Sequence, residues 1–186
     1  MTFTQTSDKL RIDAQLLTGL QIEEVTAFRW VKDAMRYIVR NHFLAAPITT
    51  ITFHSEGTDE DPSVYEFEKE LIMFERMTKH KMRRAINQPY YIVTPEGIEF
   101  YHKGDFDVTF RYMPDDPATV TTPIPIPDRY AEAIKFYVAA RIRSRIYGQG
   151  DTDAQGFDQM FYAALDEADA TTDRSNKRFR QMPARY

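Results

Sequence analysis

Residues 127–155 read PDRYAEAIKFYVAARIRSRIYGQGDTDAQ and carry the start and end signals of two successive helices. Asp128, directly after Pro127, is a favourable N-cap, so a helix is expected to begin there. Gly148 is expected to end that helix, because glycine readily adopts the left-handed conformation found after a helix C-terminus. Thr152–Gln155 has the pattern of a capping box, which predicts the start of a second helix. The stretch therefore predicts a helical hairpin.

Both helices of the hairpin have apolar residues at helical spacing. The expected core positions of the first helix are Tyr130, Ile134, Tyr137, Val138, Ile142 and Ile146. Those of the second helix are Phe157, Phe161, Ala164, Leu165 and Ala168. Three arginines, Arg141, Arg143 and Arg145, are spread around the first helix. They could pair with phosphate, but we favour pairing with the acids that follow or extension along the apolar surface, because those acids are close in sequence.

Beyond the hairpin the sign of the charge reverses. Residues 151–173 contain seven acids and no Lys or Arg, whereas residues 174–186 contain five bases and no acid. The five bases are Arg174, Lys177, Arg178, Arg180 and Arg185. We expect the second helix to fade near Thr171 and a flexible basic arm to follow over residues 174–186. A frayed, solvated terminus is the alternative, because chain ends are commonly disordered.

The N-terminal third predicts one clear helix. Residues 22–43 have apolar residues every three or four positions, with acids in the first turn and arginines in the last, as the helix dipole favours. Pro47 is expected to end the helical region. A shorter helix is possible from Leu10 to Leu20, and residues 1–8 are polar and aperiodic, which predicts a mobile arm.

The middle of the chain changes to a period of two, which is typical of strands. We expect a strand after Pro47, an acidic solvated loop at residues 56–62, and a β-meander over residues 90–112 with turns at Pro95–Gly97 and Lys103–Asp105. The sheet is expected to pack on the helices. Residues 63–88 can be read as one helix or as two strands at Val64–Phe67 and Ile72–Thr78.

Composition excludes several classes of protein. The chain has 186 residues, a net charge of −4 and no cysteine, which excludes disulfides, thiolate metal sites and a cysteine nucleophile. It has no apolar run of membrane-spanning length and no signal-peptide core. Its four histidines fall in four different predicted elements and form no metal-binding motif, and no nucleotide-binding or hydrolase motif is present. We therefore expect neither a metal nor a cofactor nor catalytic residues.

One internal segment is strongly basic. Lys79, Lys81, Arg83 and Arg84 precede two tyrosines, a combination that suits either a protein surface or single-stranded nucleic acid. A nucleic-acid-binding module that uses Lys79–Arg84 is therefore one alternative function. A small hydrolase that uses His80 or His102 with a carboxylate is another, weaker one.

The order of elements resembles a known family. An amphipathic helix is followed by short strands, a tyrosine-rich strand region over Tyr90–Tyr112, a proline-rich linker, and the helical stretch Ile126–Ala140. This order resembles that of the head–tail adaptor (connector) proteins of tailed bacteriophages. In that family the part that matches Val64–Met77 is extended, so we favour two strands there. The resemblance implies an α+β fold: a bundle of the N-terminal helix and the C-terminal hairpin within one domain over residues 1–173, with a β insertion at about 48–112.

The resemblance also implies a structural role without enzymatic activity. Such adaptors form a ring, commonly of twelve copies, below the portal at the capsid vertex. The ring extends the DNA channel, which DNA crosses without sequence-specific contacts, and offers a platform to the tail or stopper protein. The protein would be made in the cytoplasm of the bacterial host and reside in the neck of the virion, with no membrane partner.

In this family the C-terminal arm reaches into the portal, and the basic arm of this chain suits that role. The resemblance implies these portal-binding residues: Arg174, Lys177, Arg178, Phe179, Arg180, Met182, Arg185 and Tyr186. Residues that could line an interface or the channel are Lys79, Lys81, Arg83, Arg84, Arg141, Arg143 and Arg145.

Overall fold

The computed structural model describes residues 3–79 and 91–180; for Lys79 and residues 171–180 it describes the backbone alone. The chain forms two compact units. One consists of Met1–Ala45 and Asp115–Tyr186, and the other of Ala46–Pro114. All helices of the described residues belong to the first unit and all strands to the second, so the fold is α+β, as expected.

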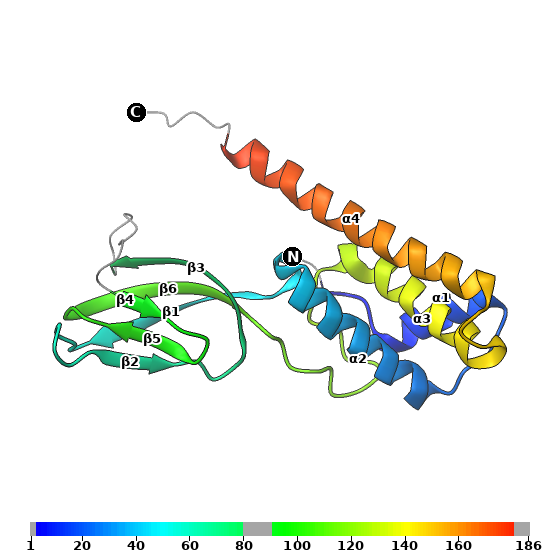
Figure 1. Cartoon of the computed structure of the whole chain (residues 1–186), viewed down its shortest axis with the longest axis horizontal. Helices are drawn as coiled ribbons and strands as arrows, with labels where there is room; N and C mark the ends of the chain where they lie inside the picture. Colours follow the sequence, from blue (N-terminus) through cyan, green and yellow to red (C-terminus); the bar gives the residue numbers. More distant parts are fainter. Residues whose placement is uncertain (1–2, 80–90, 181–186) are drawn as a thin grey trace. The chain divides into compact units, whose positions relative to one another are not determined.

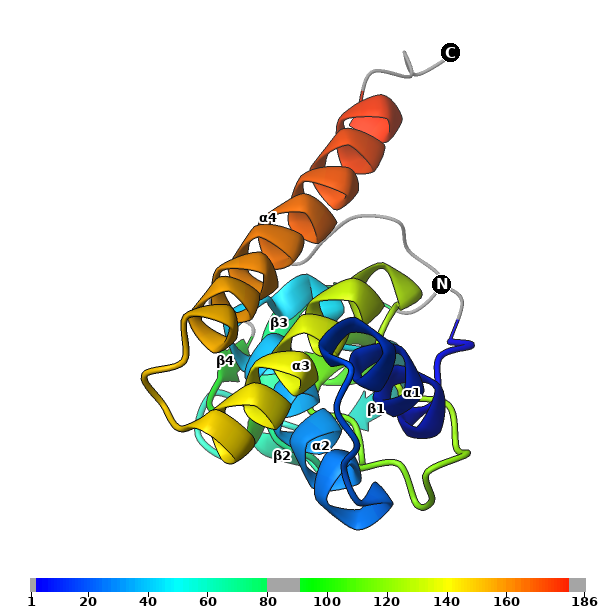
Figure 2. The ribbon, with the colours of Figure 1, turned by 90° about the vertical axis from the view of Figure 1, so that its right-hand side faces the viewer.

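The first unit is a helical bundle (Figures 1 and 2). Its elements are α1 (Ser7–Thr18), α2 (Glu24–Asn41), the 3₁₀ turns η1 (Phe43–Ala45) and η2 (Asp128–Tyr130), α3 (Ala131–Tyr147) and α4 (Thr152–Arg180). Helix α3 is central, because α1, α2 and α4 all pack against it. The structure confirms the helix predicted over residues 22–43 as α2 and the first helix of the predicted hairpin as α3.

Helix α3 is buried more widely than a single apolar stripe allows. Four of the five residues from Val138 to Ile142 are buried, with Arg141 as the exception. The buried set includes three alanines, whose small side chains let neighbouring helices approach closely: Ala133, Ala139 and Ala140. The expected stripe is correct at Ile134, but Ile146, which was expected in the core, lies exposed near the end of the helix.

Helix α4 begins and ends differently from the prediction. Its N-cap is Asp151, whose carboxylate accepts a hydrogen bond of 3.1 Å from the Ala154 backbone N–H, so the expected cap at Thr152 is wrong by one residue. The helix also continues past Thr171 to Arg180. Residues 157–180 contain neither glycine nor proline, so nothing in the sequence stops the helix there. The backbone of residues 174–180, expected in the arm, is therefore helical.

The start of the chain is also more ordered than predicted. Asp128, expected to cap a helix, accepts hydrogen bonds from the Thr4 backbone N–H at 2.8 Å and the Thr4 hydroxyl at 2.7 Å. Thr6 forms a β-bridge with Pro123 and caps α1. The prediction of a mobile arm is therefore wrong for residues 4–8, because their partners lie far away in the sequence.

The second unit contains two three-stranded antiparallel sheets (Figure 1). The strands are β1 (Ile48–Ser55), β2 (Ser63–Glu66), β3 (Leu71–Lys79), β4 (Tyr91–Val93), β5 (Gly97–Phe100) and β6 (Gly104–Tyr112). One sheet has the order β1-β6-β3 and the other β2-β5-β4. The two-strand interpretation is confirmed by β2 and β3; residues 80–88 lie outside the described part of the chain.

The predicted meander is wrong in one connection. Strands β4 and β5 form a hairpin, but β6 leaves β5 and pairs with β1 and β3 in the other sheet. Residues of both sheets share one apolar cluster, in which the Phe53 and Phe100 rings stack at 4.7 Å and the Phe100 and Phe106 rings lie 5.3 Å apart. The sheets thus bury their aromatic faces against each other, where packing on helices was expected.

We predict that α3 determines the stability of the helical unit. Ile134 is 1% exposed, so Ile134→Ala should lower the free energy of unfolding by about 2–5 kcal/mol. Ile146 on the same helix is 45% exposed, and Ile146→Ala should change it by no more than about 0.5 kcal/mol. Urea denaturation followed by helical circular dichroism measures both. Equal effects would contradict the central position of α3.

Candidate functional site

The structure places the expected portal-binding residues in two groups. The backbone of Arg174, Lys177, Arg178, Phe179 and Arg180 belongs to the last turns of α4. Met182, Arg185 and Tyr186 lie outside the described residues. In the basic cluster of the β unit, Lys79 is the last residue of β3, and Lys81, Arg83 and Arg84 likewise lie outside the described part.

The three arginines of α3 are in different environments. Arg141 is exposed, and its guanidinium lies 4.7 Å from the centre of the Tyr137 ring. Arg145 is exposed in the last turn of the helix. Arg143 is engaged within the bundle, where it donates to Asp151 at 2.8 Å and to Asp153 at 2.5 Å. The favoured pairing with the following acids is thus confirmed for Arg143.

Arg143 also helps to start α4. Its hydrogen bond to Asp151 holds the pKa of that carboxyl below its ordinary value, and the bond from the Ala154 N–H acts in the same direction. A carboxylate that stays ionised is a strong acceptor at a helix N-terminus. The ion pair therefore joins the end of α3 to the beginning of α4 and orients the hairpin.

At the other end of the hairpin, Asp169 of α4 connects three elements. Its carboxylate accepts a 2.8 Å hydrogen bond from the Tyr130 hydroxyl, and it lies 2.7 Å from Nδ1 of His42 at the end of α2. Burial, followed by the Asp169 bond, raises the pKa of Tyr130 to about 12, so this phenol remains protonated and keeps donating. The contact fixes α4 before the turns that carry the basic residues.

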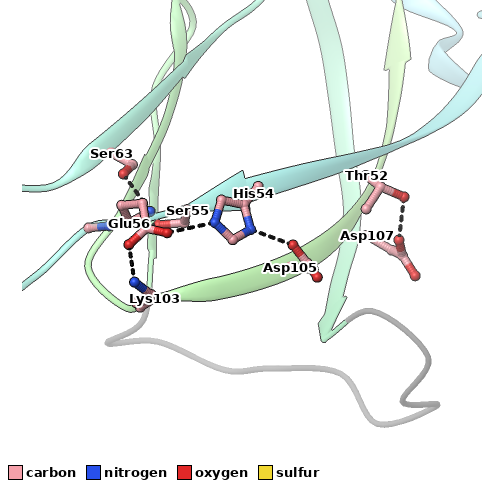
Figure 3. A network of polar contacts seen from close by, with 9 residues as sticks. Thr52, His54, Ser55, Glu56, Ser63, Lys103, Asp105 and Asp107 are labelled. Atoms are coloured by element: carbon pink, nitrogen blue, oxygen red, sulfur yellow. Dashed lines mark hydrogen bonds and ion pairs between the residues drawn. The ribbon is translucent and has the colours of Figure 1, made fainter.

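A polar network lies at one end of the β unit (Figure 3). His54 of β1 has one ring nitrogen 2.6 Å from Asp105 of β6 and the other 2.7 Å from Glu56. Glu56 also pairs with Lys103, and its backbone N–H donates to the Ser63 hydroxyl at 3.0 Å. The network therefore connects β1 and β6 of one sheet to β2 of the other, and it fixes the first residue of the acidic loop 56–62.

The geometry around His54 requires a charged ring. Both nitrogens face carboxylate oxygens, which only accept hydrogen bonds, and only the imidazolium has two N–H donors. The Asp105 bond, followed by the Glu56 bond, raises the pKa of His54. The pKa of Glu56 is lowered, mainly by its hydrogen bond with Lys103 and next by its hydrogen bond with His54. The sequence interpretation assigned His54 no role, although its position opposite Asp105 follows once β1 is paired with β6.

Within the described part of the chain, no helix is long and apolar enough to span a membrane. No group of three or more His, Cys, Asp or Glu side chains in residues 3–79 and 91–180 could hold a metal ion.

We predict that His54 titrates as a bridging imidazolium. Because its folded pKa is raised, the contribution of the network to stability is fully present below the unfolded value of about 6.5 and is lost as the pH rises through the folded pKa. NMR titration of the imidazole should show this raised pKa, and Asp105→Asn should lower it. Glu60→Gln, in the same loop, is the matched control and should leave it unchanged. An Asp105→Asn variant with the wild-type His54 pKa would refute the bridge.

Comparison with known proteins gives one match. The model of a protein family described as SU10 adaptor protein matches residues 1–185, which is almost the entire chain. No curated protein matches it. This match confirms the resemblance to head–tail adaptors. The family implies that the protein is a structural component of a virion. The protein belongs to the SU10 adaptor protein family, a family of bacteriophage head–tail adaptors.

Proposed function

We propose that this adaptor assembles into a ring below the portal, where it extends the DNA channel and presents a platform to the tail or stopper protein. The observation that carries the proposal is the family match over residues 1–185. A ring needs head-to-tail contacts between different surfaces of each copy. The division of the chain into a helical unit and a β unit supplies such different surfaces.

We further propose that residues 174–186 bind the portal protein. Five bases and no acid favour an acidic groove, with which arginine forms strong charge-assisted hydrogen bonds. Phe179, Met182 and Tyr186 add apolar anchors between the charges. Helix α4 carries this segment, and the contacts of Asp169 with Tyr130 and His42 hold α4 to the bundle. The segment would thus project from a fixed base.

The other basic residues suit contact with neighbouring copies or with passing DNA. Arg143 is occupied by two carboxylates, so among the α3 arginines Arg141 and Arg145 are the better candidates for a channel or an interface. We place Lys79, Lys81, Arg83 and Arg84 in the same class from their sequence. Contacts with phosphate are independent of base sequence, as passage of a genome requires.

We predict that the variant lacking residues 174–186 loses its portal partner. Full-length protein should co-elute with the portal protein in size-exclusion chromatography and form rings in electron micrographs of the complex. The truncated variant should not co-elute, because the charged and apolar anchors are gone. A full-length variant with all five arm bases changed to Gln should bind weakly, and its residual binding should depend less on salt than wild-type binding, because the charges that salt screens are gone.

The truncated variant should keep the helical circular dichroism of the full-length protein. Its loss of portal binding is then not caused by unfolding. Portal binding that survives both the truncation and the five substitutions would refute the role of the arm. An isolated monomer bound to the portal, without rings, would refute the ring.

A further inference from the structure

Strand β1 leaves a row of backbone hydrogen-bonding groups without a partner. The Tyr112 backbone N–H donates to the Pro47 oxygen at 3.3 Å, and the next residue, Ile48, lies opposite Arg111. Residues of an antiparallel pair alternate between hydrogen-bonded and non-hydrogen-bonded positions. The residues of β1 that turn their N–H and C=O groups away from β6 are therefore Ile48, Thr50, Thr52 and His54. Within the described part of the chain β1 pairs with β6 alone, and these groups meet no other backbone.

The edge strands of the two described sheets differ in how well they are protected against pairing. Strand β2 has four residues and β4 has three, which limits any new ladder. Strand β3 has nine, but its register against β6 shifts twice and it carries Glu75, Arg76 and Lys79. Short length, bulges and charges are the usual means by which an edge avoids pairing. Strand β1 has none of them, because its eight residues stay in register and include no Asp, Glu, Lys or Arg.

The apolar interior of the β unit is incompletely covered beside β1. Ile51 and Phe53 point inward but are only half-buried, whereas Val108 of the central strand β6 is fully buried. A hollow of about 190 Å³ opens there, and its walls include Thr49 and Ile51 of β1 and Tyr65 of β2. A strand added to β1 would therefore gain ladder hydrogen bonds and also cover apolar surface.

We infer that this strand is β1 of a second copy of the chain, antiparallel to the first, with Thr52 of each copy at a two-fold axis. The outward groups of both strands belong to even-numbered residues, so they meet in this register. Thr50 then pairs with His54 of the second copy. Ile51 lies opposite Phe53 of the second copy on the inward side of both sheets, so the half-buried side chains cover one another.

The side chains of β1 favour this register. Like charges directly opposite each other destabilise paired strands, and the charged His54 here faces the neutral Thr50. A register with Ile51 at the axis would instead set Ile48 against His54 and exchange the Ile–Phe contacts for a single Ile–Ile contact. The Thr52 hydroxyl bonds to Asp107 of β6 at 2.8 Å and the His54 ring to Asp105 at 2.6 Å (Figure 3). These side chains are thus directed toward β6, and the edge backbone stays open.

The inference goes beyond the proposed function, because it concerns the free adaptor and not the ring. A two-fold contact uses the same surface of both copies and is complete with two, whereas a ring needs contacts between different surfaces. The protected edge of β3 stops the joined sheet from growing into a fibre. The free protein is then a closed dimer, whose copies separate as they enter the ring.

Disulfide cross-linking of the full-length protein tests the register, since the chain has no cysteine. Residues of a hydrogen-bonded antiparallel pair have Cα atoms about 5.5 Å apart, which is within disulfide range. Thr52→Cys should therefore give a covalent dimer on a non-reducing gel after mild oxidation. Thr50→Cys, on the same exposed face, is the matched control and should remain monomeric, because residue 50 of the two copies would be about 14 Å apart.

Sedimentation equilibrium without the portal measures the strength of the dimer. Thr52→Pro removes one outward N–H from each copy and keeps the pairing with β6, since proline is tolerated where an edge N–H faces solvent. It should raise the dissociation constant of the dimer by about tenfold or more. Ile92→Ser also changes an exposed residue, on the far edge of the other sheet, and should leave the constant unchanged. Both variants should keep the circular dichroism of the wild type.

Three results would overturn the inference: wild-type protein that sediments as a monomer at every concentration, equal cross-linking of the Thr50→Cys and Thr52→Cys variants, or a dimer that a folded Thr52→Pro variant leaves equally strong. If Thr52→Pro does not fold, the two cysteine variants decide. Portal co-elution is measured separately, so a monomeric adaptor that still binds the portal and forms rings would leave the proposed function standing.

Discussion

The burial of α3 is the constraint on which the helical unit depends. Three helices pack against it, and this is possible because alanines occupy positions where larger side chains would hold the neighbours apart. The other helices therefore each need one apolar side facing α3. In α4, Phe161, Leu165 and Ala168 face inward, while Asp166 and Glu167 remain exposed. The charges that could meet partners are thereby left to the outer sides and the ends of the bundle.

The β unit also has to bury its apolar side chains, and it does so with short strands. Two three-stranded sheets of short strands are marginal by themselves, and each covers the aromatic side of the other. Arg111 is buried in this arrangement and is satisfied by Glu75 at 2.5 Å and by the backbone oxygen of Ala46 at 2.9 Å. Because the inner sides are buried in this way, the outer faces carry the exposed residues, such as Val64 and Ile92 on one sheet and Ile48 and Thr52 on the other.

Sequence patterns predicted what depends on near neighbours and missed what depends on distant ones. Periodicity located α2, α3 and most strands, since each pattern is contained within its own element. The pairing of β6 with β1 and β3 could not be predicted, because an alternating strand fits either sheet and the choice depends on the aromatic cluster as a whole. Thr4 and Thr6 are held in place by contacts with Asp128 and Pro123, which are distant in sequence. His54 faces Asp105 because of the register between β1 and β6, which the sequence pattern did not reveal.

The distribution of charge connects the fold to the work of an adaptor. A net charge of −4 conceals a segregated chain, with acids over residues 151–173 and bases over residues 174–186. Arg143 pairs with Asp151, and His42 contacts Asp169. Part of the acidic charge therefore stabilises the hairpin itself. Residues 174–186 themselves contain no acid. Such an arm can exchange between surfaces, because charge-assisted contacts exposed to solvent are individually weak and become strong only where several form together.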